Sequence, residues 1–478
     1  MVSNTNINRF PSKNAGDGER LPSTRAFGHR LTNDQSPMEY LIEFLMVVSG
    51  KKLTDKGSVD EYFLLYDEIF STGFSYEVER QLGLKRFIFL SRSKKDGQLK
   101  SDLDAYQTLR DVLEQHIEIN RTSVTAGDIL SILELLLYRY HAVVGNRGWH
   151  AQMILPLSPT FILPEAFPRS RAQAADPDDI FDFHKHNFLA RGGEVYYLHL
   201  ILGLRGDDEA RERLTKLIEA LFMPFASLDR LGRYISNMWD QTNGEKEPVS
   251  YSVGWIRQDA DGFGRRARLA VSELASVLAC EFEPVSKFEV LSTVIVLDLM
   301  RSLHEHACYL AGEDFPLWAI RLTNSNEMAI RKWSEGSFNN AQQDFTESLR
   351  KVGGDPSQSK DFQESLERTS KLFKKLMKAI GLVRPVTGPG AHFTLNEHLV
   401  KTLVTMLIPP GQRMLLTEFT NRIKNQFGMV FWPDDAMQSS FFRRNREAWI
   451  NLLDQCGYLT RLSDATEIVF NPYGGINV

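Results

Sequence analysis

The sequence has only three cysteines among its 478 residues. Cys280, Cys308 and Cys456 are far apart and odd in number, so they do not resemble the paired framework that holds small secreted domains together. Thiols stay reduced in the cytosol, whereas secreted proteins usually pair them. The cysteine content therefore favours a cytoplasmic protein.

Long hydrophobic runs are also missing. The longest, from Val290 to Leu297, ends at Asp298 and is far shorter than the roughly 18 apolar residues that a membrane-spanning helix needs. The segment from Met1 to Gln35 is polar and lacks the apolar core of a secretory signal peptide. We therefore expect a soluble cytoplasmic protein with no membrane partner.

Common nucleotide-binding and catalytic motifs are absent from the sequence. It contains no Gly-x-x-x-x-Gly-Lys-Ser/Thr loop, no Gly-x-Gly-x-x-Gly, no Cys-x-x-Cys and no Gly-x-Ser-x-Gly elbow. The Asp and Glu-x-Lys arrangement of metal-dependent nucleases is not evident either. These absences favour a protein that is not an enzyme and needs no cofactor, although catalytic residues need not be neighbours in sequence.

The chain has no excess of basic residues, because its formal net charge is -5 and its pI is near 6.2. A protein that grips long stretches of duplex usually carries a positive charge, so any contact with nucleic acid must be local. Hydrophobic residues make up 42% and charged residues 24% of the sequence, as in ordinary globular proteins. This length and composition predict two to four domains with packed cores.

Hydrophobic periodicity predicts a mainly α-helical protein with a multi-helical body. Residues 1–36 have scattered charges and almost no aliphatic side chains, which predicts a disordered tail. Helical patterns fill residues 37–246, an N-terminal helical domain, and residues 247–383, a central helical region. The run from Arg384 to Gly390 is rich in proline and glycine, and we place the start of a C-terminal domain, residues 384–478, there.

One helix of the body has a clear start. Thr125, with Asp128 three residues on, is typical of an N-cap. Residues 129–137 are apolar on nearly all sides, so we expect this helix to be buried between its neighbours. The run from Leu84 to Leu90 fits either a short strand or the end of a helix, and periodicity does not decide between them.

The strongest helical pattern runs from Ser286 to Leu310. Ser286 and Glu289 predict a capping box at its start. Near its end, His304 and Cys308 share a helix face, as metal ligands can. The His-Glu-x-x-His spacing that places two imidazoles on one zinc is missing, so we interpret them as polar side chains at the less buried end of a buried helix and predict no metal.

The C-terminal domain shows the order of elements that is typical of a winged helix, an α+β module. The pattern predicts helices over 396–408, 417–427 and 440–456, a short strand over 412–415 and a hairpin over 458–470. Winged helices bind nucleic acid or hold protein subunits together. They do almost no chemistry of their own.

The helix over 440–456 stands where a winged helix places the element that reads the DNA groove. Phe442, Trp449, Ile450 and Leu453 recur at helical spacing and are expected to face the core of the module. Basic side chains then face outward, and an asparagine can reach a base edge. The predicted nucleic-acid contacts are Arg443, Arg444, Asn445 and Arg446 on this helix and Arg461 in the wing. From Arg384 onward the sequence has nine Lys/Arg and eight Asp/Glu, a net charge of +1, which favours protein docking slightly over duplex binding.

A basic helix face lies just before this domain, with Lys374, Lys375 and Lys378 opposite apolar side chains. Such a face is usually only solvated, but here it can also extend a phosphate-contacting surface.

A small-ligand site is predicted where two histidines precede a glycine turn. His184 and His186 stand close to Arg191, Gly192 and Gly193, which lead into a helix. Glycines before a helix leave backbone N–H groups able to meet an anion, and the basic side chains add charge. The alternative is a turn that needs glycine for its backbone angles.

The runs Gly145 to His150 and Asn187 to Leu198 resemble uncharacterised bacterial proteins that are often carried with anti-phage defence or DNA-modification loci. The resemblance implies an accessory subunit that works with a separately encoded ATPase or nuclease. The leading hypothesis is a non-enzymatic adaptor or scaffold of a bacterial nucleic-acid-handling complex, docking co-encoded subunits. The alternatives are a sequence-specific DNA-binding regulator that uses residues 384–478, and a cryptic metal-dependent hydrolase that uses the His184, His186 and Arg191 region.

Overall fold

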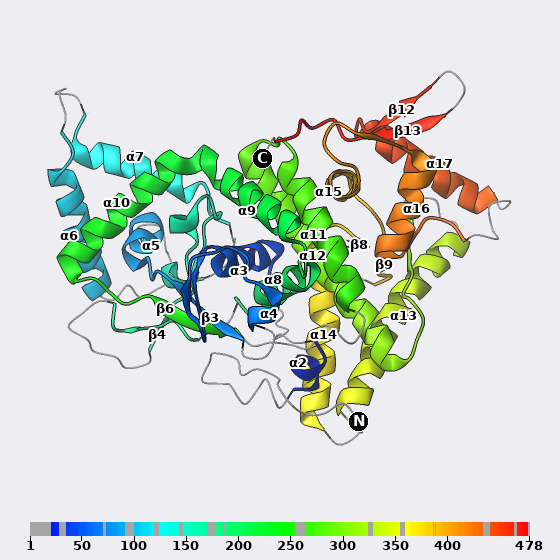
Figure 1. Ribbon diagram of the computed structural model, residues 1–478, viewed down its shortest axis with the longest axis horizontal. Helices are drawn as coiled ribbons and strands as arrows, with labels where there is room; N and C mark the ends of the chain where they lie inside the picture. Colours follow the sequence, from blue (N-terminus) through cyan, green and yellow to red (C-terminus); the bar gives the residue numbers. More distant parts are fainter. Residues whose placement is uncertain are drawn as a thin grey trace.

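The computed structural model is mostly helical, as the sequence predicts, with several small sheets (Figure 1). The helices of residues 82–138 gather at one end of the long axis and the C-terminal module lies at the other. The structure describes residues 21–27, 35–69, 73–90, 100–118, 124–142, 147–169, 178–185, 188–253, 263–323, 328–353, 359–385, 387, 389–433, 440–462 and 466–476.

Four helices pack together at the centre of the molecule: α3 (Pro37–Ser49), α8 (Gly192–Gly203), α11 (Phe263–Ala279) and α12 (Pro284–Ala311). Their buried side chains belong to one continuous hydrophobic core. α12 is the buried rod that the sequence predicts, but the predicted capping box at Ser286 is wrong. The helix begins two residues earlier, at Pro284, and the side chain of Glu283 accepts from the N–H of Ser286.

An antiparallel sheet of order β2-β1-β3-β6 lies beside this core. Its strands are β1 (Lys51–Thr54), β2 (Gly57–Val59), β3 (Phe74–Val78) and β6 (Val249–Val253). Tyr76 of β3 stands opposite Tyr251 of β6, and both side chains are buried. Because β6 follows residue 246 in sequence, the sheet joins the N-terminal and central regions that periodicity separates.

The run whose periodicity is ambiguous forms a helix, α5 (Leu82–Phe89). Arg86 is fully buried in it, and its guanidinium forms ion pairs with Asp102 and Asp178 at 3.0 and 2.5 Å. The same group lies over the rings of Trp149 and Trp239. Two carboxylates and two aromatic faces compensate this buried charge. Hydrophobic periodicity does not reveal these partners, because they come from other segments of the chain.

Helices α6 (Lys100–Gln115) and α7 (Ala126–Tyr138) form a hairpin at the end of the molecule that lies far from the C-terminal module (Figure 1). The predicted cap of α7 is confirmed, because Asp128 N donates to Thr125 Oγ1 at 3.1 Å and Thr125 N donates back to Asp128 at 2.9 Å. The prediction that α7 is buried on nearly all sides is wrong. Only its inner face is buried, and an apolar outer face is exposed.

Part of the predicted disordered tail is ordered. Residues within 21–27 form α2 (Pro22–Phe27), which packs against α13 (Met328–Gly353) and α14 (Lys360–Ala379). The ring of Phe27 meets that of Phe345 edge-on at 5.7 Å. The tail prediction is therefore wrong for this segment, since its few apolar side chains are buried against these two helices. Residues 1–20 and 28–34 lie outside the described residues.

The C-terminal elements follow the predicted order. They are α15 (Glu397–Leu407), β10 (Arg413–Leu415), α16 (Leu416–Phe427), α17 (Ser440–Gln455), β12 (Leu459–Arg461) and β13 (Glu467–Phe470). The three strands form an antiparallel sheet of order β10-β13-β12. A further short strand, β11 (Met429–Val430), was not predicted. It pairs in parallel with β7 (Trp318–Ala319) and so ties the module to the helical body.

The remaining elements connect these parts. They are α4 (Tyr66–Ile69), α9 (Asp208–Phe222), α10 (Ala226–Asn243), the 3₁₀ turns η2 (Trp149–Ala151), η3 (Pro159–Phe161) and η4 (Met223–Phe225), and the two-residue strands β4 (Phe167–Pro168), β5 (Phe181–Asp182), β8 (Val383–Arg384) and β9 (His392–Phe393).

Candidate functional site

Asn445 lies on the inner side of α17 and fastens this helix to the rest of the molecule. Its side chain is fully buried. The amide oxygen accepts from Leu322 N at 2.8 Å, and the amide nitrogen donates to Ile320 O at 2.8 Å and to Phe431 O at 2.7 Å. The prediction that Asn445 reaches a base edge is therefore wrong. Asn445 stands four residues before the buried Trp449, and this spacing already places both on one helix face.

The arginines of α17 are placed as the sequence predicts. Arg443 and Arg444 are exposed, and Arg461 is exposed on β12 of the same module. Arg446 is half-buried and forms an ion pair with Glu467 of β13 at 3.0 Å. The module therefore exposes arginines both on α17 and on the hairpin.

The start of α17 also contacts the helical body. The ring of Phe442 meets that of Trp333, on α13, edge-on at 5.3 Å. Phe442 was expected in the core of the module itself. Together with Asn445, this contact places the N-terminal half of α17 against α13 and the segments that follow β7 and β11.

The basic face of α14 does not extend this surface. Lys375 is exposed and Lys374 and Lys378 are half-buried, opposite an apolar face that is buried as predicted. Burial, and to a smaller extent the charge of Lys374, lowers the pKa of Lys378. In Figure 1, however, α14 and α17 lie well apart. The two sets of cations therefore form separate surfaces.

The glycine turn before α8 does receive an acidic group, but that group is a side chain of the protein. The carboxyl oxygens of Glu43, on α3, accept from Arg191 N at 2.6 Å and from Gly193 N. Gly192 and Gly193 make this approach feasible, because a Cβ on either would stand 2.0 Å from the ring of Tyr40 or 2.3 Å from Phe44 N. The predicted chemistry of a helix N-terminus is thus used internally.

The side chains of the predicted ligand site have different partners. Arg191 is buried and bonds Glu194 and the carbonyl of Ser252. His184 is exposed and meets the ring of Tyr251 edge-on at 6.0 Å. His186 lies outside the described residues. An external anion at this turn would have to displace Glu43, so the geometry disfavours the ligand site.

A cleft of about 720 Å³ lies between the helical body and the C-terminal module. At its inner end, donor atoms of His304, Cys308 and Asp344 all lie within 4.8 Å of one another. The sequence indicates that His304 and Cys308 share a face, but Asp344 comes from α13 and joins them only through helix packing. The other lining residues include Asp314, Leu317, Lys332, Trp333, Asn340, Val430 and Pro433.

Known proteins offer no comparison for this arrangement. No protein-family model matches the chain, and neither a curated protein nor a solved structure matches it. Within the described residues, no helix is long and apolar enough to cross a membrane.

The hydrogen bonds of His304 disfavour a metal in the His304, Cys308 and Asp344 cluster. Trp318 Nε1 donates to His304 Nδ1 at 2.8 Å, so the ring proton sits on Nε2, which faces Asp344 Oδ2 at 2.8 Å. A histidine that binds a metal normally donates its other N–H to an acceptor. Here the other nitrogen faces a donor, and a metal on Nε2 would require an imidazolate.

Cys308 is also poorly suited to nucleophilic catalysis. Burial, together with the nearby Asp344, raises the pKa of its thiol. The reactive form of cysteine is the thiolate, which needs the opposite shift. His304 cannot accept its proton, because Nδ1 is occupied by Trp318 and Nε2 carries a proton. The cluster is a hydrogen-bonded support between α12 and α13.

Proposed function

We propose that this chain is a non-enzymatic adaptor of a bacterial nucleic-acid-handling complex. In this proposal the C-terminal elements act as a winged helix that docks protein partners, together with the helical body. The observation that carries the proposal is the position of α17. The inner face of its N-terminal half is fixed to the body through Asn445 and Phe442. Arg443 and Arg444, in the same half of the helix, are exposed.

This position suits docking better than groove reading. A recognition helix enters the major groove with its N-terminal residues toward the bases. The N-terminal part of α17 lies against α13 and the β7–β11 pair, so the body stands beside that approach. A net charge of +1 for residues 384–478 adds little phosphate attraction. Two arginines on a rigid, nearly neutral surface fit an acidic patch on a protein.

The test is reconstitution with the protein products of the neighbouring genes. We expect the full chain to form a stoichiometric complex with at least one of them, measured by light scattering and calorimetry. Arg443→Glu/Arg444→Glu should weaken it about tenfold or more, since two cations become anions. Arg230→Glu/Arg233→Glu, which makes the same charge change at exposed positions of α10, should leave the affinity unchanged. Equal affinity of both variants would contradict the proposal.

A second candidate function is sequence-specific binding of duplex DNA. The exposure of Arg443, Arg444 and Arg461 on one module favours it. It predicts that the full chain shifts duplex DNA at low salt and that Arg443→Ala/Arg444→Ala reduces the slope of log K against log salt by about 2. If the protein docks only proteins, neither the unmodified protein nor the variant should shift duplex DNA.

A further inference from the structure

The outer face of α7 carries a cluster of exposed apolar side chains. Ile132, Leu135 and Leu136 are 55%, 46% and 54% exposed. The opposite face, with Leu130, Glu134 and Leu137, is buried. A single exposed leucine is ordinary, but three on one face of a 13-residue helix form a patch that typically marks an interface.

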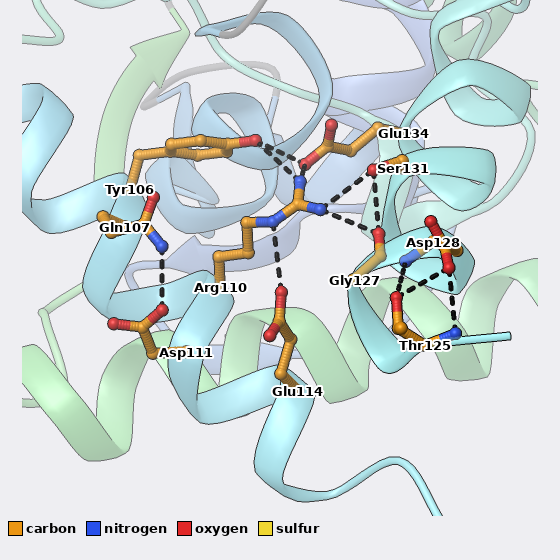
Figure 2. Close-up of polar contacts among 10 residues, drawn as sticks. All are labelled: Tyr106, Gln107, Arg110, Asp111, Glu114, Thr125, Gly127, Asp128, Ser131 and Glu134. Carbon is orange, nitrogen blue, oxygen red and sulfur yellow. Dashed lines mark hydrogen bonds and ion pairs between the residues drawn. The ribbon is translucent and has the colours of Figure 1, made fainter. Parts of the chain in front are cut away.

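A polar network holds α7 in place, so this patch is a fixed surface (Figure 2). Arg110 of α6 donates to Glu134 Oε1 at 2.9 Å, to Ser131 Oγ at 2.9 Å and to the carbonyl of Gly127 at 2.8 Å. The hydroxyl of Tyr106 also donates to Glu134, at 2.5 Å. Figure 2 shows these groups meeting between the two helices.

The exposed face has the spacing of a coiled-coil seam. Thr125, Asp128, Ile132, Leu135 and Arg139 follow one another at intervals of three, four, three and four residues. At 3.6 residues per turn these positions form one continuous stripe along the helix. Asp128 and Arg139 are exposed at opposite ends of it. The stripe therefore has an acidic end, an apolar middle and a basic end.

We propose that a second copy of this chain packs on α7, with the two α7 helices antiparallel about a two-fold axis. An axis at the midpoint between residues 133 and 134 places Asp128 of each copy opposite Arg139 of the other. The same axis places Ile132 opposite Leu135. In an antiparallel coiled coil, each seam position of one helix meets the other type of seam position on its partner. A two-fold axis forms each of these pairs twice, so the surface must be complementary to itself.

The charges select the orientation. A parallel pair would set Asp128 against Asp128 and Arg139 against Arg139, which is repulsive. The antiparallel pair joins unlike charges and also opposes the two helix dipoles favourably. In Figure 1, α7 lies at the end of the molecule opposite the C-terminal module, so the second copy leaves the docking surface of α17 open. This inference goes beyond the adaptor role and does not depend on it.

The interface is short, and this sets the expected affinity. A helix of 13 residues is about 20 Å long. A contact along that length buries less than the roughly 800 Å² per partner of a standard interface. We therefore expect a reversible dimer with a dissociation constant on the order of micromolar.

Sedimentation of the full chain tests the proposal. The 54.6 kDa chain should dimerise reversibly as its concentration rises to about 100 µM. Ile132→Lys/Leu135→Lys should weaken the dimer about 100-fold or more, because four charges then meet in the seam. Met223→Lys/Met328→Lys makes the same chemical change at methionines that are 72% and 64% exposed elsewhere. This control should dimerise like the unmodified chain.

A charge exchange tests the orientation. Arg139→Glu should weaken the dimer about tenfold, because it sets two carboxylates together. Asp128→Lys should do the same by pairing two cations, and circular dichroism checks that α7 keeps its helix without the Asp128 cap. Mixing these two variants should restore the affinity, since Asp128 then meets Arg139 and Glu meets Lys.

Three results would overturn the proposal. The first is an unmodified chain that remains monomeric at about 100 µM. The second is a dimer that survives Ile132→Lys/Leu135→Lys with unchanged affinity, because its interface then lies elsewhere. The third is a monomer whose α7 face binds a different protein, which would make that protein the occupant.

Discussion

The carboxyl group of Glu43 accepts a hydrogen bond from the backbone N–H of Gly193, which lies 150 residues away in the sequence. The same carboxyl group accepts from Arg191 N, so it caps the N-terminus of α8 from the neighbouring helix α3. The side chain is buried, and Tyr76 links the nearby Glu194 to the same region by a 3.0 Å hydrogen bond. Two central helices are thus joined through one ionisable group.

This burial predicts a pH-dependent stability. Desolvation, and then the charge of Glu194, raises the pKa of Glu43 to about 8, against the lowering effect of the two N–H donors. The unfolded chain loses this proton near its ordinary value of 4.5, whereas the folded chain keeps it to about 8. The stabilisation is complete below 4.5 and is lost as the pH rises to 8. The slope from this group is at most about 1.4 kcal/mol per pH unit.

Glu43→Gln tests this dependence. Glutamine does not titrate, so the difference in unfolding free energy between the two chains should change between pH 5 and pH 8, in favour of the variant at the higher pH. At pH 5 the variant should be less stable by about 1–3 kcal/mol, because its amide sets a donor against an N–H. Denaturant titrations measure both effects. The exposed Glu209→Gln should show neither, and a constant difference across this range would contradict the raised pKa.

Close packing of α3 against α8 gives a second prediction. Gly193→Ala places a methyl group 2.3 Å from the backbone nitrogen of Phe44, which cannot move aside alone. We expect a loss of about 3 kcal/mol or more in unfolding free energy. Gly336→Ala is the matched control, since no atom lies within 4 Å of its new methyl group and alanine favours the helix. It should stabilise the protein by about 0.5–1 kcal/mol, measured by the same titrations.

These residues also show where inference from the sequence succeeds and where it stops. Local rules identified the cap of α7, the buried rod of α12 and the order of the C-terminal elements. The turn at 191–193 was predicted to be an anion site, but the acidic side chain that occupies it, Glu43, comes from a distant helix. In the same way, Asp344 comes from a different helix than His304 and Cys308. Contacts between distant segments depend on how the helices pack, and one sequence carries no local signal for them.

The exposed face of α7 illustrates a different limit. A helix that is apolar on nearly all sides is predicted to be buried, because exposing leucine side chains to water is unfavourable. The sequence does not say whether the neighbour that covers it belongs to the same chain. Ile132, Leu135 and Leu136 remain exposed within the described residues, so their partner is supplied by another chain in the proposed dimer.

Asn445 carries the third prediction. Asn445→Ala leaves the N–H of Leu322 and the carbonyls of Ile320 and Phe431 without this partner, which should cost about 2–4 kcal/mol. Asn445→Asp should cost more, because a carboxylate cannot donate to the two carbonyls. The exposed Arg443→Ala should change the stability by no more than about 0.5 kcal/mol. Chemical unfolding distinguishes the three, and an unaffected Asn445→Ala would contradict the anchoring of α17.

The fourth prediction concerns the cluster beside the cleft. While the indole N–H of Trp318 occupies His304 Nδ1, the protein should bind no stoichiometric Co²⁺, and the thiolate-to-cobalt absorption band should be absent. Trp318→Phe removes that donor and keeps an aromatic ring against His304, so Nδ1 can then carry the proton. This variant should bind Co²⁺ through His304, Cys308 and Asp344 and show the band.

Cys308→Ser in the Trp318→Phe background is the control for this experiment, because it keeps the shape of the site but removes the thiolate and therefore the band. Cobalt binding with the band in the unmodified protein would show that the indole does not close the site. If Trp318→Phe binds no Co²⁺, the hydrogen bond from Trp318 to His304 is not what prevents metal binding. The tautomer of one buried histidine, set by a neighbouring indole, thus decides whether three metal-binding side chains form a metal site or a structural contact.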